Sequence, residues 1–149
     1  MRRGQLHVSY CTNVHPGEGL DAVDAVLTDH VAAVKAKVSP DAPLGLGLRL
    51  GHAAAATLAA SADRRAALID RLQALDLYVF TLNGFPYGDF AASRVKETVY
   101  QPDWRDPARV AYTLQLAEAL AAMPGPSRRT ISTVAGGFRP DTGTAEDRR

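Results

Sequence analysis

The hydrophobic pattern of this chain predicts an α/β fold with a parallel sheet. Four short β-like runs alternate with helical patterns, and every run ends in a polar or glycine-rich loop. Regular alternation of this kind is typical of βαβ units, in which a helix returns the chain to a parallel strand. The four runs cover residues 5–10, 44–50, 77–83 and 129–134.

Composition narrows the class of protein. A chain of 149 residues has the size of one domain, and 46% hydrophobic with 22% charged residues is ordinary for a globular protein. Because 17 basic and 16 acidic side chains give a net charge of +1, we expect no nucleic-acid partner. No run of about 18 apolar residues indicates a membrane span. The single Cys11 excludes an intrachain disulfide, so we expect a cytoplasmic protein.

The first unit is a short strand over residues 5–10, a turn and a helix. The turn is the segment Asn13-Val14-His15-Pro16-Gly17, whose composition is typical of a loop. From Leu20 to Val38, apolar residues recur at spacings of three and four, which predicts one amphipathic helix ended by Pro40.

The second unit opens with LGLGLRL, residues 44–50, in which leucines occupy every second position. A period of two indicates a strand. Gly45 and Gly47 lie inside this strand, not in the turn that a dinucleotide fingerprint requires, so they favour the close approach of a neighbouring side chain. An alanine-rich helix over residues 53–60 follows, and Ser61 is a suitable N-cap for the next helix.

The third unit carries the strand LYVFTLN, residues 77–83, and the loop GFPYGD. The strand has no strict polar alternation, which is typical of a parallel strand covered on both faces. A long connection over residues 90–105 contains Trp104, which we expect to anchor it. Asp106-Pro107 then forms an N-cap and first-turn pair, and the helical spacing of the apolar residues that follow predicts the buried face of this helix, which consists of Val110, Leu114, Ala117, Leu120 and Ala121.

The fourth strand, residues 129–134, leaves the closure of the sheet open. Residues 139–149 are polar and charged, so we expect a disordered tail after a domain of residues 1–138. Four strands suit either a doubly wound sheet or about the first half of a TIM barrel, which has eight strands and about 250 residues. Because a polar loop follows every strand, the sequence favours a parallel (β/α) half-barrel with its site at the carboxyl ends of the strands.

Two residues are candidates for catalysis. His15 follows the first strand and is able to carry a proton or bind a substrate oxygen, although loop histidines are often structural. Asn83 ends the third strand and offers a donor and an acceptor to a sugar hydroxyl. Its alternative role is an Asx turn before Gly84.

Other residues are candidates for substrate binding. Arg49 ends the second strand and suits a phosphate or carboxylate, or else an ion pair with a nearby acidic side chain. Aromatic residues of the third loop are candidates for an apolar wall against a sugar face. We predict a substrate site from Asn13, Arg49, Phe85, Tyr87 and Arg94. Cys11 and His15 alone are too few ligands for zinc, so we predict no metal site in this chain.

Five segments of the chain together resemble a known family. They are SYCTNVHPGEGLDAV, LGLGLRL, LYVFTLNGFPYGDF, RVKETVYQPDW with DPARVAYTLQLA, and ISTVAGGF. In this order they resemble the N-terminal part of the metabolite-traffic protein EboE family. That family belongs to the xylose-isomerase-like TIM barrels, the class of sugar phosphate isomerases and epimerases. The resemblance covers about residues 6–138.

The resemblance implies a role in handling or exporting a small polar metabolite. It also implies a membrane-protein partner from the same gene cluster, which encodes a prenyltransferase-like protein. In isomerases of this superfamily, Glu, Asp and His from later strands hold a divalent metal. We therefore expect this chain to be a truncated member of the family that holds no cofactor and is inactive alone. In a full-length relative we expect a divalent metal.

Two other interpretations stay open from the sequence. In the first, the chain is a non-enzymatic module that binds or carries a metabolite. In the second, it is an inactive incomplete fragment. In a half-barrel the first and fourth strands are unpaired edges, so we also expect self-association.

Overall fold

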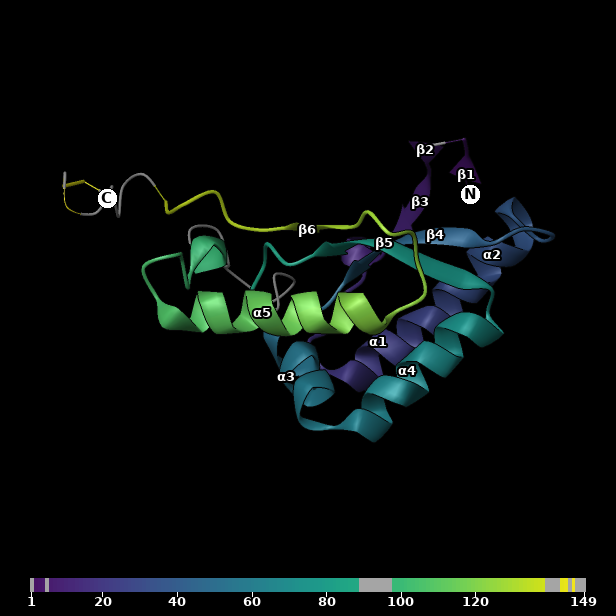
Figure 1. The fold of residues 1–149 in the computed structure, drawn as a ribbon, viewed down its shortest axis with the longest axis horizontal. Helices are drawn as coiled ribbons and strands as arrows, with labels where there is room; N and C mark the ends of the chain where they lie inside the picture. Colours follow the sequence, from purple (N-terminus) through teal and green to yellow (C-terminus); the bar gives the residue numbers. More distant parts are fainter. Residues whose placement is uncertain (1, 5, 89–97, 139–142, 145, 147–149) are drawn as a thin grey trace.

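The centre of the molecule is a parallel sheet of four strands (Figure 1). The computed structural model describes residues 2–4, 6–88, 98–138, 143–144 and 146. The strands lie in chain order: β3 (Ser9–Cys11), β4 (Leu44–Arg49), β5 (Leu77–Asn83) and β6 (Thr130–Ser132). This order lacks the reversal that defines a doubly wound sheet. The α/β fold with a parallel sheet is as predicted, and its order is that of successive units of a (β/α) barrel.

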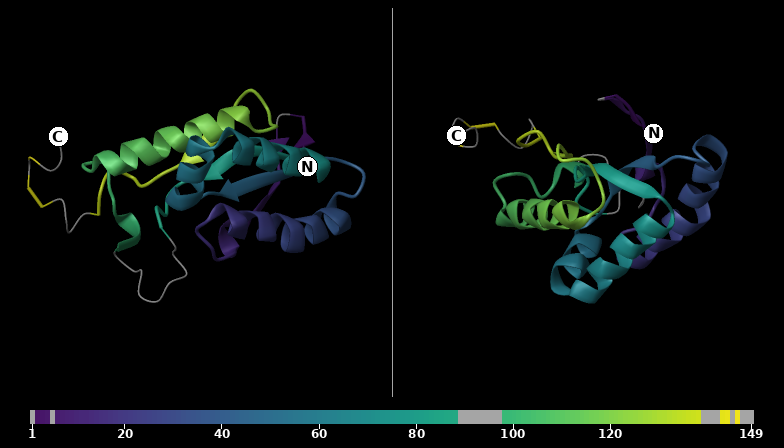
Figure 2. Two further views of the ribbon diagram at one scale, coloured as in Figure 1. Left: turned by 90° about the horizontal axis from the view of Figure 1, so that it is seen from below. Right: turned by 45° about the vertical axis from the view of Figure 1, so that its right-hand side comes forward.

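All the long helices lie on one side of the sheet (Figures 1 and 2). The predicted helix over residues 20–38 is formed by α1 (Leu20–Val26), a π-helical stretch η2 (Leu27–Val31) and α2 (Ala32–Val38). It ends before Pro40, as the pattern predicted. The Nζ of Lys35 donates to the carbonyl of Ser39 at 2.7 Å, which satisfies one of the last acceptors of the helix.

Two predicted helix caps are confirmed. Helix α3 (His52–Ala60) passes to α4 (Ala62–Ala74) through Ser61, whose hydroxyl accepts from the backbone N–H of Arg64. Asp106 caps α5 (Pro107–Ala122) by accepting from the backbone N–H of Ala108 at 2.8 Å. Side-chain caps of this kind contribute about 1 kcal/mol each.

The buried face of α5 differs from the prediction. Val110 and Leu114 are 43% and 60% exposed, whereas Arg109, Tyr112 and Leu116 are buried. Both series have helical spacing, so periodicity alone does not choose between them. The choice is made by loop carbonyls that Arg109 and Tyr112 reach from the inside of the molecule.

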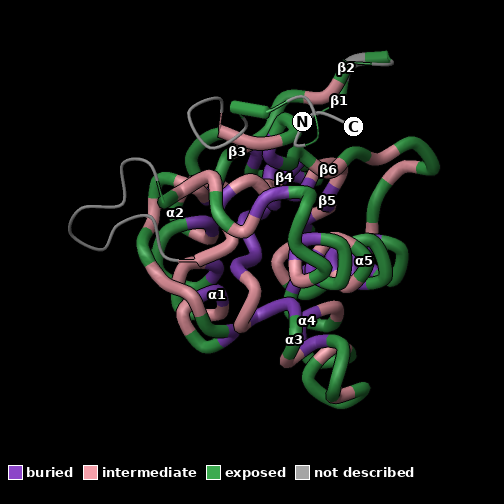
Figure 3. The backbone as a smooth tube through the Cα atoms, turned by 90° about the vertical axis from the view of Figure 1, so that its left-hand side faces the viewer, coloured by how far each residue is buried: buried purple, intermediate pink, exposed green. Residues whose placement is uncertain are grey.

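The face of the sheet toward the helices is the hydrophobic core (Figure 3). Its strand residues are buried leucines and valines, among them Leu46, Leu48, Val79 and Leu82. They pack against Leu27 and other apolar residues of the helix layer. Full burial stabilises by roughly 1.5–3 kcal/mol for each such side chain, so this face holds the fold together.

The other face of the sheet carries small and polar residues. In the register of the strands, Ser9 lies beside Gly45, Cys11 beside Gly47, and Thr81 beside Thr130. Helices cover β5 on one face only, because the crossovers between strands in sequential order all place their helices on the same side (Figure 2). On the other face its residues are half-buried, and the His7 ring packs on Tyr78 and Phe80.

A bulge explains why β5 showed no alternation in the sequence. Val79 pairs with Leu46 and Thr81 with Gly47, so Phe80 is an extra residue between them. The inserted residue breaks the period of two while keeping Val79 and Leu82 in the core.

Both edge strands are shorter than predicted. The run at residues 5–10 is divided between β2 (Leu6–His7), which forms a hairpin with β1 (Arg2–Arg3), and β3. Gly4 turns this hairpin with a φ of 61°. At the other edge, Arg129 does not extend β6, because its guanidinium donates to the carbonyls of Leu120 and Met123 at the end of α5.

Trp104 anchors its connection as expected. Its indole N–H donates to the carbonyl of Val134 at 2.8 Å, which ties the segment before α5 to the segment after β6. Helix η3 (Thr98–Tyr100) begins the part of the connection that the structure describes.

Candidate functional site

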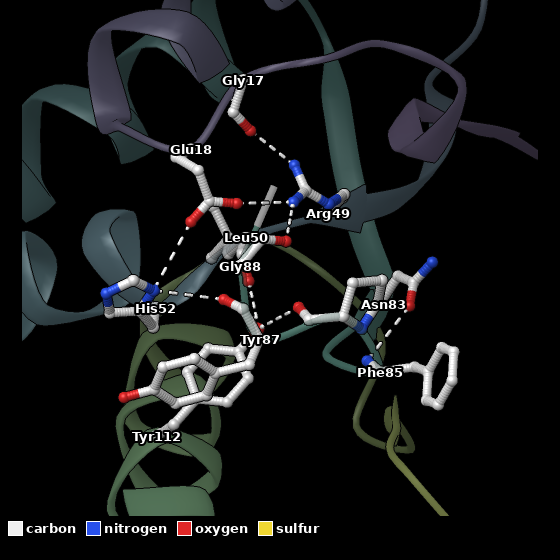
Figure 4. Close-up of polar contacts among 11 residues, drawn as sticks. Gly17, Glu18, Arg49, Leu50, His52, Asn83, Phe85, Tyr87, Gly88 and Tyr112 are labelled. Carbon is white, nitrogen blue, oxygen red and sulfur yellow. Dashed lines mark hydrogen bonds and ion pairs between the residues drawn. The ribbon is translucent and has the colours of Figure 1, made fainter. Parts of the chain in front are cut away.

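The carboxyl ends of the four parallel strands meet at one edge of the sheet. There, Arg49, Asn83 and Ser132 are neighbours in the register of β4, β5 and β6. We call this edge, with His52 and Tyr87 of the adjoining loops, the carboxyl rim. Figure 4 shows Arg49 at its centre, with His52 and Asn83 on either side.

Arg49 ties three segments of the rim together. Its guanidinium donates to the carbonyl of Gly17 at 2.5 Å, to Oε1 of Glu18 at 2.8 Å and to the carbonyl of Gly88 at 2.8 Å. The residue is 6% exposed. The ion pair considered as the alternative for Arg49 is therefore present, and these contacts direct its charge to the protein itself and not to a substrate.

Glu18 links Arg49 to a histidine. Its second carboxylate oxygen, Oε2, lies 3.4 Å from Nδ1 of His52. A Cβ at Gly51 would lie 2.8 Å from Oε1, so the carboxylate needs a glycine at this position. Because α3 begins at His52, the carboxylate also lies at the positive end of that helix dipole.

His52 is held in one orientation with its outer edge exposed. Its Nδ1 lies 3.2 Å from the carbonyl oxygen of Tyr87, and its ring stacks on the Tyr87 ring at 4.4 Å and 7°. Since Nδ1 lies within hydrogen-bond distance of the Tyr87 carbonyl, which only accepts, it carries the ring proton, while Oε2 of Glu18 acts on it through charge and not through a hydrogen bond. Nε2 is then the acceptor of a side chain that is 45% exposed.

Arg109 and Tyr112 of α5 support the loop after β5 from inside. The fully buried Arg109 guanidinium donates to the carbonyls of Pro102 at 2.8 Å, Gly84 at 2.9 Å and Phe85 at 3.3 Å. It also lies 5.6 Å from the centre of the Tyr112 ring. Burial lowers the pKa of Arg109, but an arginine keeps its charge in proteins.

Tyr112 joins this loop to the end of β4. Its hydroxyl donates to the carbonyl of Leu50 at 2.5 Å, and its ring meets Tyr87 edge-on at 5.1 Å. Burial raises the pKa of Tyr112, so the hydroxyl stays a proton donor. The stack of His52 on Tyr87 therefore rests on a fixed support.

Asn83 forms the Asx turn that was its alternative role. Its Oδ1 accepts from the backbone N–H of Phe85 at 3.3 Å and from the hydroxyl of Ser132 at 3.1 Å. These two contacts use only Oδ1. The amide N–H groups of Asn83 are therefore available to donate to an acceptor of a ligand on the helix-free side of the sheet.

The predicted aromatic wall is not formed by one surface. Phe85 points away from Tyr87 and meets Tyr100 edge-on at 5.6 Å (Figure 4). Asn13 lies half-buried in the short helix η1 (Thr12–Val14), and Arg94 lies outside the described residues.

His15 is turned toward the helix layer. Its Nε2 lies 2.8 Å from the hydroxyl of Tyr10, and its ring stacks on His30 of η2 at 4.2 Å. Burial, and then the neighbouring His30, lower its pKa. The cavity that it lines with Arg49 measures about 20 Å³, which is room for about one water. His15 and Asn83 therefore do not share a site.

The most important contacts of the rim were missed from the sequence. Neither Glu18 nor His52 was predicted as a site residue. No local signal connects them, because the residues that meet are 34 positions apart. For Arg109 and Tyr112 a signal existed, since they continue to Leu116 and Leu120 at helical spacing.

No family model, curated protein or solved structure matches this chain. The resemblance to the EboE family therefore stays a prediction from the sequence. In the part of the chain that the structure describes, no helix is long and apolar enough to cross a membrane. Nor do three metal-binding side chains of the His, Cys, Asp or Glu type gather among those residues.

Proposed function

We propose that the carboxyl rim binds a small polar metabolite of the sugar type and that His52 transfers a proton to and from it. The observation that carries this proposal is the fixed His52 ring. Its Nδ1 faces Glu18 and the Tyr87 carbonyl, and the outer part of the side chain is exposed. A carboxylate behind an imidazole sets the tautomer and stabilises the imidazolium that forms when Nε2 accepts a proton.

The other groups of the rim suit a polyhydroxylated ligand. The Asn83 amide supplies donors, and the exposed Ser132 hydroxyl both donates and accepts. When isomerisation or epimerisation of a sugar proceeds through an enediol, a base removes a carbon-bound proton and a proton is then returned to carbon. The reaction class therefore agrees with the sugar isomerase and epimerase class that the resemblance implies.

The proposed proton transfer uses only side chains of this chain. A divalent metal, which the resemblance assigns to later strands, does not fit the described residues, because they hold no group of three suitable ligands. The rim occupies four strands, so we propose that further elements complete it, either in a longer relative or through self-association at the free edges of β3 and β6. We place this activity in the cytoplasm.

A second candidate function is a non-enzymatic carrier that presents the metabolite to a membrane-protein partner. The contacts of Arg49 favour the carrier. Its guanidinium, the strongest cation of the rim, donates to loop carbonyls and so shapes the site, and it does not act on a bound anion. An incomplete fragment without function is the third interpretation, and it requires that the rim bind no metabolite.

The test is a panel of aldoses, ketoses and their phosphates in deuterated water. Binding is followed by ligand-observed NMR, and proton transfer by incorporation of solvent deuterium at carbon. We expect His52→Gln to slow deuterium incorporation by roughly 100-fold or more, while the affinity changes little. His15→Gln is the matched control and leaves both unchanged.

The outcomes separate the candidate functions. Binding without deuterium incorporation by the unaltered chain would support the carrier. No binding of any member of the panel would contradict the proposed rim. Equal effects of His52→Gln and His15→Gln would contradict the role of His52.

A further inference from the structure

A second pocket lies at the opposite end of the sheet from the rim. It measures about 480 Å³, within the usual range of small-molecule sites, and is lined by Arg2, His7, Pro43, Tyr78, Gly125 and Pro126. Pro43 precedes β4, Tyr78 is the half-buried second residue of β5, and Pro126 precedes β6. The pocket therefore sits at the amino ends of the strands.

Tyr78 and His7 form the polar floor of this pocket. The Tyr78 hydroxyl lies 3.1 Å from Nδ1 of His7. The ring reaches it by crossing β4 at Gly45, where a Cβ would lie only 2.9 Å from the hydroxyl oxygen. The glycine noted in the sequence as a place of close approach thus positions this tyrosine on the helix-free face.

The pair presents a hydrogen-bond donor whichever atom holds the shared proton. If the Tyr78 hydroxyl donates to Nδ1, the neutral His7 ring carries its proton on Nε2. If Nδ1 donates, the hydroxyl hydrogen is left for a ligand. Burial raises the pKa of Tyr78, which keeps this hydroxyl protonated at neutral pH.

Arg2 supplies a positive charge at the mouth of the pocket. Its Nε donates to the carbonyl of Gly4 at 2.8 Å, which fixes one side of the exposed guanidinium and leaves its two Nη groups for an acceptor. Its charge acts on Tyr78, lowering the pKa of the hydroxyl against the larger effect of burial. The cation therefore lies close to the donor pair.

Apolar residues form the remaining walls. Pro43 and Pro126 are rigid and carry no side-chain donor or acceptor, and Ala42 lies beside them. A ligand that satisfies both parts of the pocket has an anionic group for Arg2 and Tyr78 and a compact apolar body for the prolines. A guanidinium pairs with a carboxylate through two parallel hydrogen bonds.

We propose that this amino-end pocket binds a small organic carboxylate with a flat, ring-sized apolar body. The site is independent of the function proposed for the rim, because it shares none of its residues. It uses Arg2, His7 and Tyr78 as donors and the two prolines as the apolar walls.

The test is a titration of the full chain with benzoate, followed through backbone amide NMR shifts. Benzamide has the same body without the charge, and inorganic phosphate has charge without the body. We expect saturable benzoate binding with shifts at the amides of residues 42, 44, 45, 78 and 125, and roughly tenfold weaker binding of each of the other two probes.

Variants connect the binding to the named side chains. Arg2→Gln should weaken benzoate binding by about tenfold and Tyr78→Phe by several-fold. Arg71→Gln, an exposed arginine of α4, is the matched control and should have no effect. The proposal is overturned if benzoate does not saturate, if benzamide binds as well, if the shifts lie at the rim, or if the Arg71 control weakens binding equally.

Discussion

The two faces of the sheet differ more than any other two regions of the molecule. Toward the helices, Leu46, Leu48, Val79 and Leu82 are at most 1% exposed. On the other side, Ser9, Cys11 and Thr130 are exposed, and the strands carry glycines and hydroxyl groups. One face thus holds the fold together, while the other leaves polar groups available at both ends of the strands.

The difference arises within single strands. In β4 the alternation of leucine with glycine sends every apolar side chain to the helix layer and leaves room above Gly45 and Gly47 for side chains of the neighbouring strands. A sheet with this pattern needs helices on only one side. It therefore leaves the amino-end pocket and, at the carboxyl rim, Asn83 and Ser132 on the uncovered side, whereas His52 of the rim begins α3 in the helix layer.

The largest expected effect compares one residue from each face. Leu46→Ala should lower the free energy of unfolding by about 3 kcal/mol, because a fully buried leucine leaves a cavity. Thr130→Ala removes an exposed hydroxyl bonded to Thr81 and should cost no more than about 0.5 kcal/mol. Urea unfolding measures both values. Similar costs at the two positions would contradict the contrast between the faces.

The second-largest expected effect tests whether the buried Arg109 of α5 stabilises the loop after β5. Arg109→Met should cost about 2–3 kcal/mol, because the carbonyls of Gly84, Phe85 and Pro102 lose their donor in a closed environment. The exposed Arg71→Met on α4 is the matched control and should change stability by less than about 0.5 kcal/mol. A stable Arg109→Met protein with an unchanged loop would show that the guanidinium does not support the rim.

A smaller effect tests the contact between Glu18 and Gly51. Gly51→Ala should cost about 1–2 kcal/mol, since the new Cβ would overlap the carboxylate. The same substitution should cost less in a Glu18→Ala background, which a double-mutant cycle measures. Gly88→Ala is the control, because a Cβ there meets no atom of the described residues within 4 Å. Additive effects of the Glu18 and Gly51 changes would argue against the close approach.

The smallest expected effect is a dependence of the free energy of unfolding on pH, which arises from His15 on the helix side of the sheet. The folded-state pKa of His15 lies below its ordinary value of 6.5, because of burial and then of His30. The unfolded chain therefore binds this proton more tightly, so stability is complete above about pH 6.5 and falls as the pH drops below it. His15→Gln should flatten the dependence of unfolding free energy on pH between 7.5 and 5. An unchanged slope would contradict the lowered pKa of the partly buried His15.

The sequence predicted those parts of the fold that depend on local pattern. The alternation of β4 and the caps at Ser61 and Asp106 are properties of a few adjacent residues, and the structure confirms them. The order of strand and helix followed from the same patterns. Together they were enough for the fold class, since parallel strands joined by helices allow few arrangements.

What the sequence did not predict depends on partners far along the chain. The burial of Arg109 follows from carbonyls 24 and 25 residues away, and the orientation of His52 from Glu18 and Tyr87. The bulge at Phe80 appears only when β5 is aligned with β4. For the same reason the contacts of His15 with Tyr10 and His30 were not predicted from the sequence.

The most direct test of the uncovered face is the reactivity of Cys11. Its Sγ would lie 3.2 Å from a Cβ placed on Gly47, so the thiol stands on the helix-free side, and the residue is exposed. At low protein concentration, a thiol reagent such as dithionitrobenzoate should label native Cys11 within a few-fold of the rate for the urea-unfolded chain. Strong protection of Cys11 at that concentration, by 100-fold or more, would contradict an uncovered face and the sites placed on it.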